Sequence, residues 1–536
     1  MSKPEKIPIE KYDYPLPDEL IAKYPLADRD KSKILVYRPG AGTGTTGPKN
    51  IPQGARVGKQ EQLSHESEIL NQEQLSQESM IHEHREASLD PMAQEQLSKK
   101  SDIRKKRQPS TGSVARDQKQ FSQAQGLSEK RQDAGIIEQK QFFQVPELLE
   151  KSDRLYFNAT RVVQARLVFR KETGARIEIF CLEPHLPADH QLAFASTQAV
   201  EFICLVGNAK KWKEGKLTKN CGADAVTAEI SGRQDDKFIV RFSWNDPATS
   251  FGEILERSGS TPIPPYLNRE ADERDAITYQ TVYAREKGSV AAPTAGLHFT
   301  EKVLGALDQK GVQRHELILH VGAGTFIPVK EKNAVHHQMH AELVTADRSL
   351  LESLLTGDRK IAVGTTTTRS LESIYWLGVK AISNAHFSFD NLFLEQWDAY
   401  ELEQGDSQYQ LKQSSMNEME DGTPLEKEAA PHKLEHSLAN EMDDKVPLEK
   451  AVRALLNKMN DSGIDSFSFH TRLMITPGYR FRVIGGLFTN FHQPKSTLLL
   501  LIAAVAGDDW RRIYDYALKN DFRFLSYGDS SLLFFQ

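Results

Sequence analysis

The sequence predicts an α/β main domain with an inserted all-β, barrel-like domain and two disordered insertions, on three observations. Short apolar segments alternate with helical patterns in the second half of the chain, which is typical of α/β folds. Between residues 165 and 255, strand patterns follow one another with turns between them. Residues 40–134 and 403–444 are polar and poor in aromatic side chains, so they cannot offset their ordering entropy by burying apolar surface.

The first polar segment interrupts a predicted strand pair. Residues 33–37 (KILVY) and 135–143 (GIIEQKQFF) both have strand character. The cost of closing a loop grows only logarithmically with its length, so a hairpin tolerates an enlarged turn. We therefore assign residues 1–39 and 135–164 to the start of the α/β domain, and residues 256–402 and 445–536 to its remainder.

The remaining elements follow from local patterns. Residues 166–183 predict two strands around a glycine turn, and residues 237–244 a further strand. Later strands are expected at the apolar segments 316–321, 360–363 and 496–506. The strand at 360–363 leads into a helix that reaches Glu372, and the strand at 496–506 leads into a helix at 509–520.

Composition excludes several classes of protein. The 536 residues are 39% hydrophobic, yet the longest apolar run, 496–506, is shorter than the roughly twenty residues of a membrane span. The N-terminus has lysines but no apolar segment of a secretory signal behind them, so we expect a cytoplasmic protein without membrane association. Three cysteines, Cys181, Cys204 and Cys221, fit neither a disulfide framework nor a zinc site and are expected to be buried thiols.

The formal net charge of −6 lacks the overall basic character of a bulk nucleic-acid binder. RNA contact would need a local basic patch. Basic residues recur beside the motif blocks described next, which suggests a phosphate-binding rim there, with aromatic rings for base stacking. The basic residues are Arg161, Arg166, Arg285, Lys287 and Lys495, and the aromatic residues are Tyr283, Phe299 and Phe491.

Several blocks carry Gly, His, Thr, Arg and Pro where an ordinary core would be apolar. The densest are FNATRVVQARL, PTAGLHFT, LHVGAGTF, VGTTTTRSLES and NFHQPKSTLL. Together and in this order they closely resemble the QueA family, the S-adenosylmethionine:tRNA ribosyltransferase-isomerases. The resemblance begins at residues 12–36 and covers essentially everything outside the two insertions.

The resemblance implies an enzyme of queuosine biosynthesis. Its reaction transfers the ribosyl part of S-adenosylmethionine to the aminomethyl group of 7-aminomethyl-7-deazaguanine at the tRNA wobble position and isomerises it to an epoxycyclopentane. Adenine and methionine leave, so S-adenosylmethionine is a consumed co-substrate, and neither a cofactor nor a metal is expected. The expected partners are tRNA and S-adenosylmethionine.

Histidines are the titratable groups best suited to base catalysis near neutral pH. We take His298, His320, His340 and His492 as catalytic candidates, although each histidine could equally be structural. His337 and His340 could share a helix face with Glu342 and hold a metal, but no further ligand set at suitable spacing supports this.

Polar and glycine residues of the blocks are the substrate-binding candidates. Thr365 and Thr366 could cap a helix or bind a ribose or carboxylate, and Arg369 needs an anion that a ligand, RNA or Glu372 would supply. The full set is Asn158, Arg161, Pro293, Thr294, Gly296, Gly322, Gly324, Thr325, Phe326, Gly364, Thr365, Thr366, Arg369, Glu372, Asn490 and Lys495.

Ligands of α/β sheets gather where strand ends and helix N-termini open together. We therefore predict that residues 293–299, 320–326, 364–369 and 490–496 converge on one pocket. At least two of the five histidines named above should line it, namely His298, His320, His337, His340 and His492. Two rival functions stay open. An RNA methyltransferase using S-adenosylmethionine would need an early glycine-rich loop that is not found, and a non-catalytic RNA-binding descendant would retain the fold without the reaction.

Overall fold

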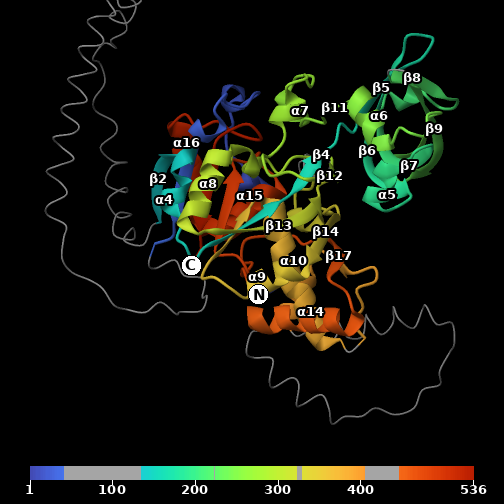
Figure 1. Ribbon diagram of the computed structural model, residues 1–536. Coiled ribbons are helices and arrows are strands. Elements are labelled where there is room, and N and C mark those ends of the chain that lie inside the picture. Colours follow the sequence, from blue (N-terminus) through green and yellow to red (C-terminus); the bar gives the residue numbers. More distant parts are fainter. Residues whose placement is uncertain (41–134, 222–223, 323–328, 385, 405–445, 536) are drawn as a thin grey trace, which may run out of the picture. The chain divides into compact units, whose positions relative to one another are not determined.

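The computed structural model describes residues 1–40, 135–221, 224–322, 329–384, 386–404 and 446–535 (Figure 1). These described residues form one compact unit. The predicted insertion at 40–134 lies outside the described residues except for Gly40. The predicted insertion at 403–444 also lies outside them, but its first two residues are described, and Glu403 ends a helix.

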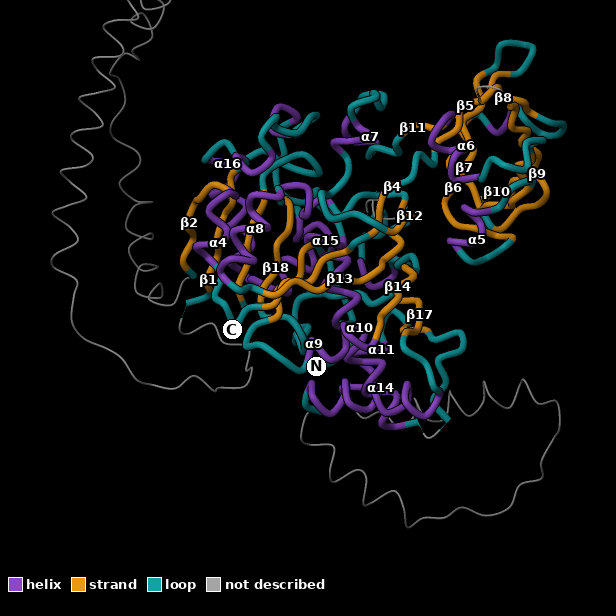
Figure 2. Tube along the Cα trace, in the orientation of Figure 1, coloured by secondary structure: helices purple, strands orange, loops and turns teal. Residues whose placement is uncertain are grey.

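A ten-stranded sheet organises this unit (Figure 2). Its four central strands, β13, β3, β15 and β18, run parallel, and antiparallel strands extend both sides. The mixed α/β class expected from the alternating apolar segments is therefore confirmed. In spatial order the strands are β16 (Phe393–Leu394), β17 (Ser466–Thr471), β14 (Glu342–Asp347), β13 (Gln313–His320), β3 (Arg154–Asn158), β15 (Lys360–Val363), β18 (Gly486–Asn490), β19 (Ser530–Phe534), β1 (Lys33–Arg38) and β2 (Ile136–Gln141).

The strands that flank the first polar segment do pair. β1 and β2 are antiparallel, with Lys33 opposite Gln141 and Arg38 opposite Ile136. β1 is buried between neighbours and carries the apolar run, whereas β2 lies at the sheet edge and is only half-buried. The predicted strand pair is confirmed.

Helices cover the sheet, and the longest in the described part of the chain is α10 (Thr365–Ser383). It packs against α14 (Leu448–Ser462) so closely that a Cβ on Gly378 would lie 2.4 Å from the Ala451 carbonyl oxygen. The other α-helices here are α4 (Val145–Leu148), α7 (Asp275–Thr278), α8 (Glu301–Lys310), α9 (Arg348–Leu354), α11 (Asp398–Glu403), α15 (Thr497–Ala506) and α16 (Trp510–Lys519). Short 3₁₀ helices are Ile9–Tyr12, Asp18–Leu20, Arg29–Lys31, Phe142–Gln144, Ala209–Lys211, Pro265–Leu267, Thr294–His298, Ala334–His336 and Gly507–Asp509.

The strand predicted at 496–506 is wrong, because this segment is helix α15. The Ser496 hydroxyl accepts a hydrogen bond from the Leu499 N–H and caps the helix. The segment is rich in Leu and Ala, which favour helices, and an unbroken apolar run has no periodicity to distinguish the two structures. This helix starts where the site described below opens.

Residues 166–260 form a separate seven-stranded antiparallel sheet with its own apolar core around Phe169, Trp212 and Phe242. Gly174, at φ +80°, turns the predicted strand pair of 166–183. Helices α5 (His190–Ala195) and α6 (Phe251–Ser258) pack on it. In spatial order its strands are β11 (Gly259–Ser260), β5 (Arg166–Arg170), β6 (Arg176–Leu186), β7 (Ala199–Gly207), β10 (Lys237–Ser243), β9 (Asp224–Gln234) and β8 (Leu217–Cys221).

A two-stranded parallel sheet, β4 (Thr160–Val162) with β12 (Glu286–Ser289), completes the strands. The three cysteines are free and buried, as expected. Among the described helices, none has the length and apolar character that a membrane crossing requires.

Candidate active site

The motif blocks meet at a cavity over the carboxyl ends of the central strands. Each of the four predicted blocks contributes to its wall: Pro293 and Thr294, then Val321, then Gly364 to Thr366, then Asn490 to Gln493 with Ser496. The predicted convergence is therefore found among the described residues, while Gly324, Thr325 and Phe326 lie outside them. The lining residues are Tyr266, Ala291, Ala292, Pro293, Thr294, Ala295, Val321, Gly364, Thr365, Thr366, Thr489, Asn490, Phe491, His492, Gln493, Ser496, Thr497, Leu498, Leu525 and Ser526.

Two helix N-termini open on this cavity. β15 ends at Val363, and Gly364 turns the chain into α10 at φ +101°, a conformation that a residue with a side chain rarely adopts. β18 ends at Asn490, and Ser496 then caps α15. Unsatisfied N–H groups and the positive ends of both helix dipoles therefore face the same space, which favours an anionic group such as a carboxylate.

The four threonines that begin α10 divide into two pairs. The hydroxyl of Thr367 donates to the Val363 carbonyl at 2.9 Å, and that of Thr368 donates to the Gly364 carbonyl at 3.2 Å. Thr365 and Thr366 line the cavity, and neither hydroxyl has a hydrogen-bond partner among the described residues. Thr367 and Thr368 therefore stabilise the start of the helix, whereas the hydroxyls of Thr365 and Thr366 are available to a ligand.

His492 is held on the cavity wall by its own backbone. Its N–H donates to the Tyr514 hydroxyl at 3.0 Å, and its carbonyl accepts from the Tyr14 hydroxyl. Its ring Nε2 lies 2.7 Å from the Thr489 hydroxyl, and Nδ1 has no partner among the described residues. Burial lowers the pKa of His492 to about 3, so the ring is neutral at pH 7.

His298 stands behind the wall and does not line the cavity. Thr294 donates to the Asn490 side-chain oxygen at 2.8 Å, which leaves the Asn490 amide to donate to His298 Nε2 at 3.3 Å. The proton of His298 is then on Nδ1 and is donated to Ser32 at 2.8 Å. Burial lowers the pKa of His298 to about 3. This chain fixes the orientation of Asn490, so His298 is a positioning residue here.

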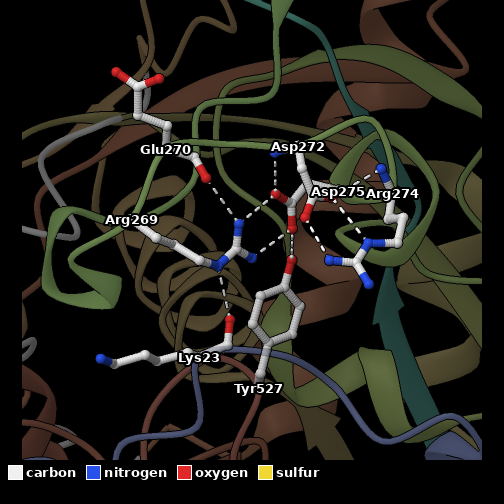
Figure 3. Close-up of polar contacts among 7 residues, drawn as sticks. All are labelled: Lys23, Arg269, Glu270, Asp272, Arg274, Asp275 and Tyr527. Atoms are coloured by element: carbon white, nitrogen blue, oxygen red, sulfur yellow. Dashed lines mark hydrogen bonds and ion pairs between the residues drawn. The ribbon is translucent and has the colours of Figure 1, made fainter.

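A loop and the C-terminal segment form another part of the wall. Tyr266 and Ser526 share a short hydrogen bond between their hydroxyls. Beside them, Arg269 binds Asp275 with two hydrogen bonds of 2.7 Å, and Tyr527 donates to the same carboxylate at 2.9 Å (Figure 3). Burial opposes ionisation of Asp275, but Arg269 and the backbone N–H of Asp272 hold its pKa below the ordinary value. The cluster locks this wall in place.

Arg369 and Glu372 have partners within the protein. The Arg369 guanidinium pairs with Glu342, and both side chains are buried. Glu372 accepts hydrogen bonds from the Tyr479 hydroxyl and from the backbone N–H groups of residues 482–484. Neither residue lines the cavity. The anion predicted for Arg369 is thus Glu342, not Glu372, and the bonds of Glu372 explain its burial without a ligand.

Three further candidates also have structural environments. Asn158 is fully buried and joins β3 to β13 through the backbone of Leu319. A Cβ on Gly296 would lie 1.8 Å from the Tyr283 hydroxyl, so its lack of a side chain admits that ring. Lys495 pairs with Glu10 and Asp13 at 2.8 and 3.0 Å. Arg161 is exposed on β4, and Gly322 follows the lining residue Val321.

Only His492 of the five candidate histidines lines the cavity, where at least two were expected. His320 stacks on His190 with ring centroids 4.0 Å apart, in space that Gly288 leaves open. His340 lies 3.6 Å from Glu342, and His337 bonds to Glu331. A sequence shows which residues follow a strand but not which way each ring turns.

The predicted basic and aromatic rim is not found as described. Arg166, Arg285 and Lys287 each pair with a glutamate, at 3.0, 3.3 and 2.6 Å. Tyr283 and Phe299 are buried in an apolar core, and Phe491 is 1% exposed on the cavity wall. Most of these cations already have partners, and the rings lack the open faces that base stacking needs.

The helix face proposed for a metal does not form. The 3₁₀ turn ends at His336, and Glu342 begins β14. Within the described part of the chain, no group of three metal-ligating side chains was found.

Sequence reasoning missed at least five residues of the site, among them Thr489, whose hydroxyl lies 2.7 Å from His492 Nε2. Tyr14 and Tyr514 hold the His492 backbone, and Tyr266 and Ser526 form part of the wall. Tyr14 and Ser526 do lie within the part of the chain that resembles the QueA family. Their polar partners are far away in the sequence, so only the fold shows what they contact.

Comparison with known proteins supports membership of the family that the motif blocks resemble. The model of a family described as queuosine biosynthesis protein matches residues 111–397 and 448–533. An S-adenosylmethionine:tRNA ribosyltransferase-isomerase of Aromatoleum aromaticum is 34% identical over 409 residues, covering 75% of this chain and 88% of the relative. That of Erythrobacter litoralis is 36% identical over 412 residues, with coverages of 75% and 88%.

Among solved structures, S-adenosylmethionine tRNA ribosyltransferase from Thermotoga maritima matches with a TM-score of 0.34 and 21% identity, covering 97% of this chain and 99% of that one. So loose a match adds nothing to the assignment, which rests on the sequence comparisons. The family model spans more than half of the chain, and the relatives are matched over most of their length. The chain therefore belongs to the queuosine biosynthesis protein family.

Proposed function

We propose that this chain is an S-adenosylmethionine:tRNA ribosyltransferase-isomerase, the activity in the names of its relatives. The observation that supports this best is the single cavity into which four separate motif blocks bring two helix N-termini, two free threonine hydroxyls and a neutral histidine. A cavity so equipped suits a small zwitterionic substrate that carries a carboxylate and must lose a proton.

The proposed reaction joins S-adenosylmethionine to the aminomethyl group of 7-aminomethyl-7-deazaguanine at the tRNA wobble position. A bond forms between the amine nitrogen and the ribosyl group. The carbon–sulfur bond to methionine and the bond to adenine break, and the ribose rearranges to an epoxycyclopentane. A base must take a proton from the carbon beside the sulfonium, and the amine nitrogen loses a proton as its bond to carbon forms. The departing adenine takes up one proton, so one proton is released overall as the sulfonium charge disappears. The products are epoxyqueuosine-tRNA, adenine and methionine.

His492 is the group in the cavity best placed to act as that base. Thr489 lies within reach of both the Asn490 carbonyl, at 3.4 Å, and His492 Nε2, at 2.7 Å. When Thr489 donates to the carbonyl, His492 Nε2–H donates to Thr489 and the Nδ1 lone pair is available. Burial keeps the His492 ring neutral. For the same reason, protonation of the substrate amine next to the sulfonium of S-adenosylmethionine is disfavoured, so the amine stays neutral and nucleophilic.

The methionyl carboxylate is proposed to lie at the N-termini of α10 and α15, with the hydroxyls of Thr365 and Thr366 as donors. This position places the carboxylate where both helix dipoles stabilise an anion. Thr294 and Asn490, oriented through His298, are the proposed polar contacts on the opposite block. No metal or further cofactor takes part, so activity should survive extensive chelation.

Residues 165–255 are proposed to act as an inserted, barrel-like domain. Their strands pair with each other, β5 lies near β8 at the opposite end of the strand order, and their core is separate. Because the proposed substrate is tRNA, the expected compartment is the cytoplasm.

The direct test is product analysis. Purified protein is incubated with S-adenosylmethionine and tRNA bearing 7-aminomethyl-7-deazaguanine, and nucleosides are analysed by mass spectrometry. Epoxyqueuosine with released adenine and methionine is the expected result. A methylated nucleoside with S-adenosylhomocysteine would identify a methyltransferase, and binding without product would identify an RNA-binding descendant; either would contradict the proposal.

A further inference from the structure

The seven-stranded sheet carries a basic loop that the cavity does not use. Residues 208–219, here called the lysine loop, comprise the connection between β7 and β8 and the first three residues of β8, and they contain five lysines and one glutamate. In a chain whose net charge is −6, this is a local reversal of sign. The lysines are Lys210, Lys211, Lys213, Lys216 and Lys219.

The lysine loop has an ordered framework. Trp212 is 1% exposed in the core of the sheet, and its indole N–H donates to the Gly215 carbonyl at 2.9 Å. Asn208 and Gly215 turn the chain at positive φ, and the Asn208 amide donates to the Arg176 carbonyl at 3.0 Å. With its aromatic ring inside, the loop turns its charges outward.

These charges are largely free. Of the five lysines, only Lys216 has a carboxylate partner among the described residues, Glu229 at 3.7 Å, and both side chains are exposed. Lys210, Lys211 and Lys213 are exposed. Lys171, in the neighbouring β5–β6 turn, donates to the Lys211 carbonyl and adds a further cation. Arg166, Arg285, Lys287 and Lys495, by contrast, each form an ion pair with a carboxylate.

The loop is connected to the cavity wall by contacts in the structure. Arg176, which the loop touches through Asn208, lies 3.7 Å from Glu270. Glu270 is next to Arg269 in the chain, and Arg269 binds Asp275 (Figure 3). Tyr527 donates a hydrogen bond to the same Asp275 carboxylate and is next to Ser526, which lines the cavity. A polyanion that extends beyond the cavity along this side would meet the lysines.

We propose that the lysine loop binds the phosphate backbone of the tRNA at a distance from the modified nucleotide. This inference rests on the proposed function. Lysines act as hydrated point charges suited to phosphates, and their contribution to RNA binding depends steeply on salt. A protein partner would need an apolar or aromatic centre for its interface, and the one aromatic ring of the loop is buried.

The test neutralises three exposed lysines in the variant Lys210→Gln, Lys211→Gln, Lys213→Gln. The matched control is Lys302→Gln, Lys450→Gln, Lys519→Gln, three exposed lysines on α8, α14 and α16. Binding of tRNA is measured by fluorescence anisotropy at several salt concentrations, and kcat and KM are measured with the same tRNA. Thermal melting shows that each variant is folded.

We expect the slope of log affinity against log salt to become shallower by about 2 to 3 for the loop variant, since each lost phosphate contact removes roughly one unit or slightly less. KM for tRNA should rise about tenfold or more at physiological salt, with kcat at saturating tRNA unchanged. The control should keep the wild-type slope and KM.

An unchanged slope in a folded loop variant would overturn the proposal, and so would an equal loss in the control. Lower kcat with unchanged tRNA affinity would also overturn it. These outcomes are separate from failure of the proposed function, which would show as wild-type protein that forms no epoxyqueuosine.

Discussion

The polar residues of the motif blocks differ in whether the protein already uses their hydrogen-bonding groups. On the cavity wall, Thr365, Thr366 and His492 keep donors or acceptors without a partner among the described residues. Behind the wall, Glu372 accepts four hydrogen bonds, and Glu342 pairs with Arg369. Both groups come from the same blocks of sequence. The residues on the wall are available to bind or react with a ligand, and the residues behind the wall hold them in position.

The difference separates loss of activity from loss of stability. A substitution on the wall should change turnover or substrate affinity and leave unfolding unaltered. A substitution behind the wall leaves a buried group without its partner and should first lower the free energy of unfolding. The predictions that follow test this separation.

Replacing His492 with glutamine should have the largest effect. If its ring takes the proton, kcat should fall about 10²- to 10⁴-fold, the usual contribution of a positioned base, with little change in thermal stability. Steady-state kinetics measures this. His337→Gln is the control, because His337 binds Glu331 outside the cavity and should keep wild-type kcat. Equal kcat in both variants would remove His492 from the mechanism.

Glu342→Gln should instead act on folding. Removing the charge leaves the buried Arg369 guanidinium uncompensated, which should cost about 3 to 5 kcal/mol in urea unfolding. Glu449→Gln breaks an exposed ion pair with Arg453 and should cost less than about 1 kcal/mol. An equal loss of unfolding free energy in the two variants would show that the buried Arg369–Glu342 pair stabilises the protein no more than an exposed pair does.

The sheet order and the cavity show what sequence could and could not predict. The β1–β2 pair, the 166–183 strand pair and the strand at 360–363 followed from local patterns, because alternation and turn residues act over a few positions. The sequence predicts a strand where helix α15 forms, since an unbroken apolar segment has no polar face. The convergence of four blocks was predictable from strand ends, but the partners of Arg369 and Glu372 depend on contacts between distant segments.

Acid should destabilise the protein through its buried histidines. His298, His492 and His190 each have a pKa lowered by burial to about 3, below the value near 6.5 expected when unfolded. Between these values the unfolded chain binds more protons, so stability falls as the pH drops from about 6.5 toward 3, by at most about 1.4 kcal/mol per pH unit for each histidine. Urea unfolding over this range measures the slope.

The variant His298→Gln removes one of these titrating groups. Its unfolding free energy should depend on pH less steeply than that of the wild type, by about 1.4 kcal/mol per unit at most. An unchanged slope would mean that His298 is protonated in the folded protein, in conflict with the hydrogen bonds it makes to Ser32 and Asn490.

The smallest expected effect distinguishes two adjacent threonines. Thr366→Val removes a hydroxyl that faces the cavity and should raise KM for S-adenosylmethionine about 5- to 20-fold, the value of one lost hydrogen bond, without changing stability. Thr367→Val removes a hydroxyl that donates to the Val363 carbonyl and should leave KM unchanged. If both variants raise KM equally, the division between wall and support does not hold at α10.

The most direct test of the proposed site is an experimental structure with S-adenosylmethionine bound. The cavity should hold the ligand, with the methionyl carboxylate against the first N–H groups of α10 and α15 and the ribose within hydrogen-bond distance of His492. A ligand bound elsewhere on the protein, or bound here with its carboxylate away from both helix N-termini, would contradict the account.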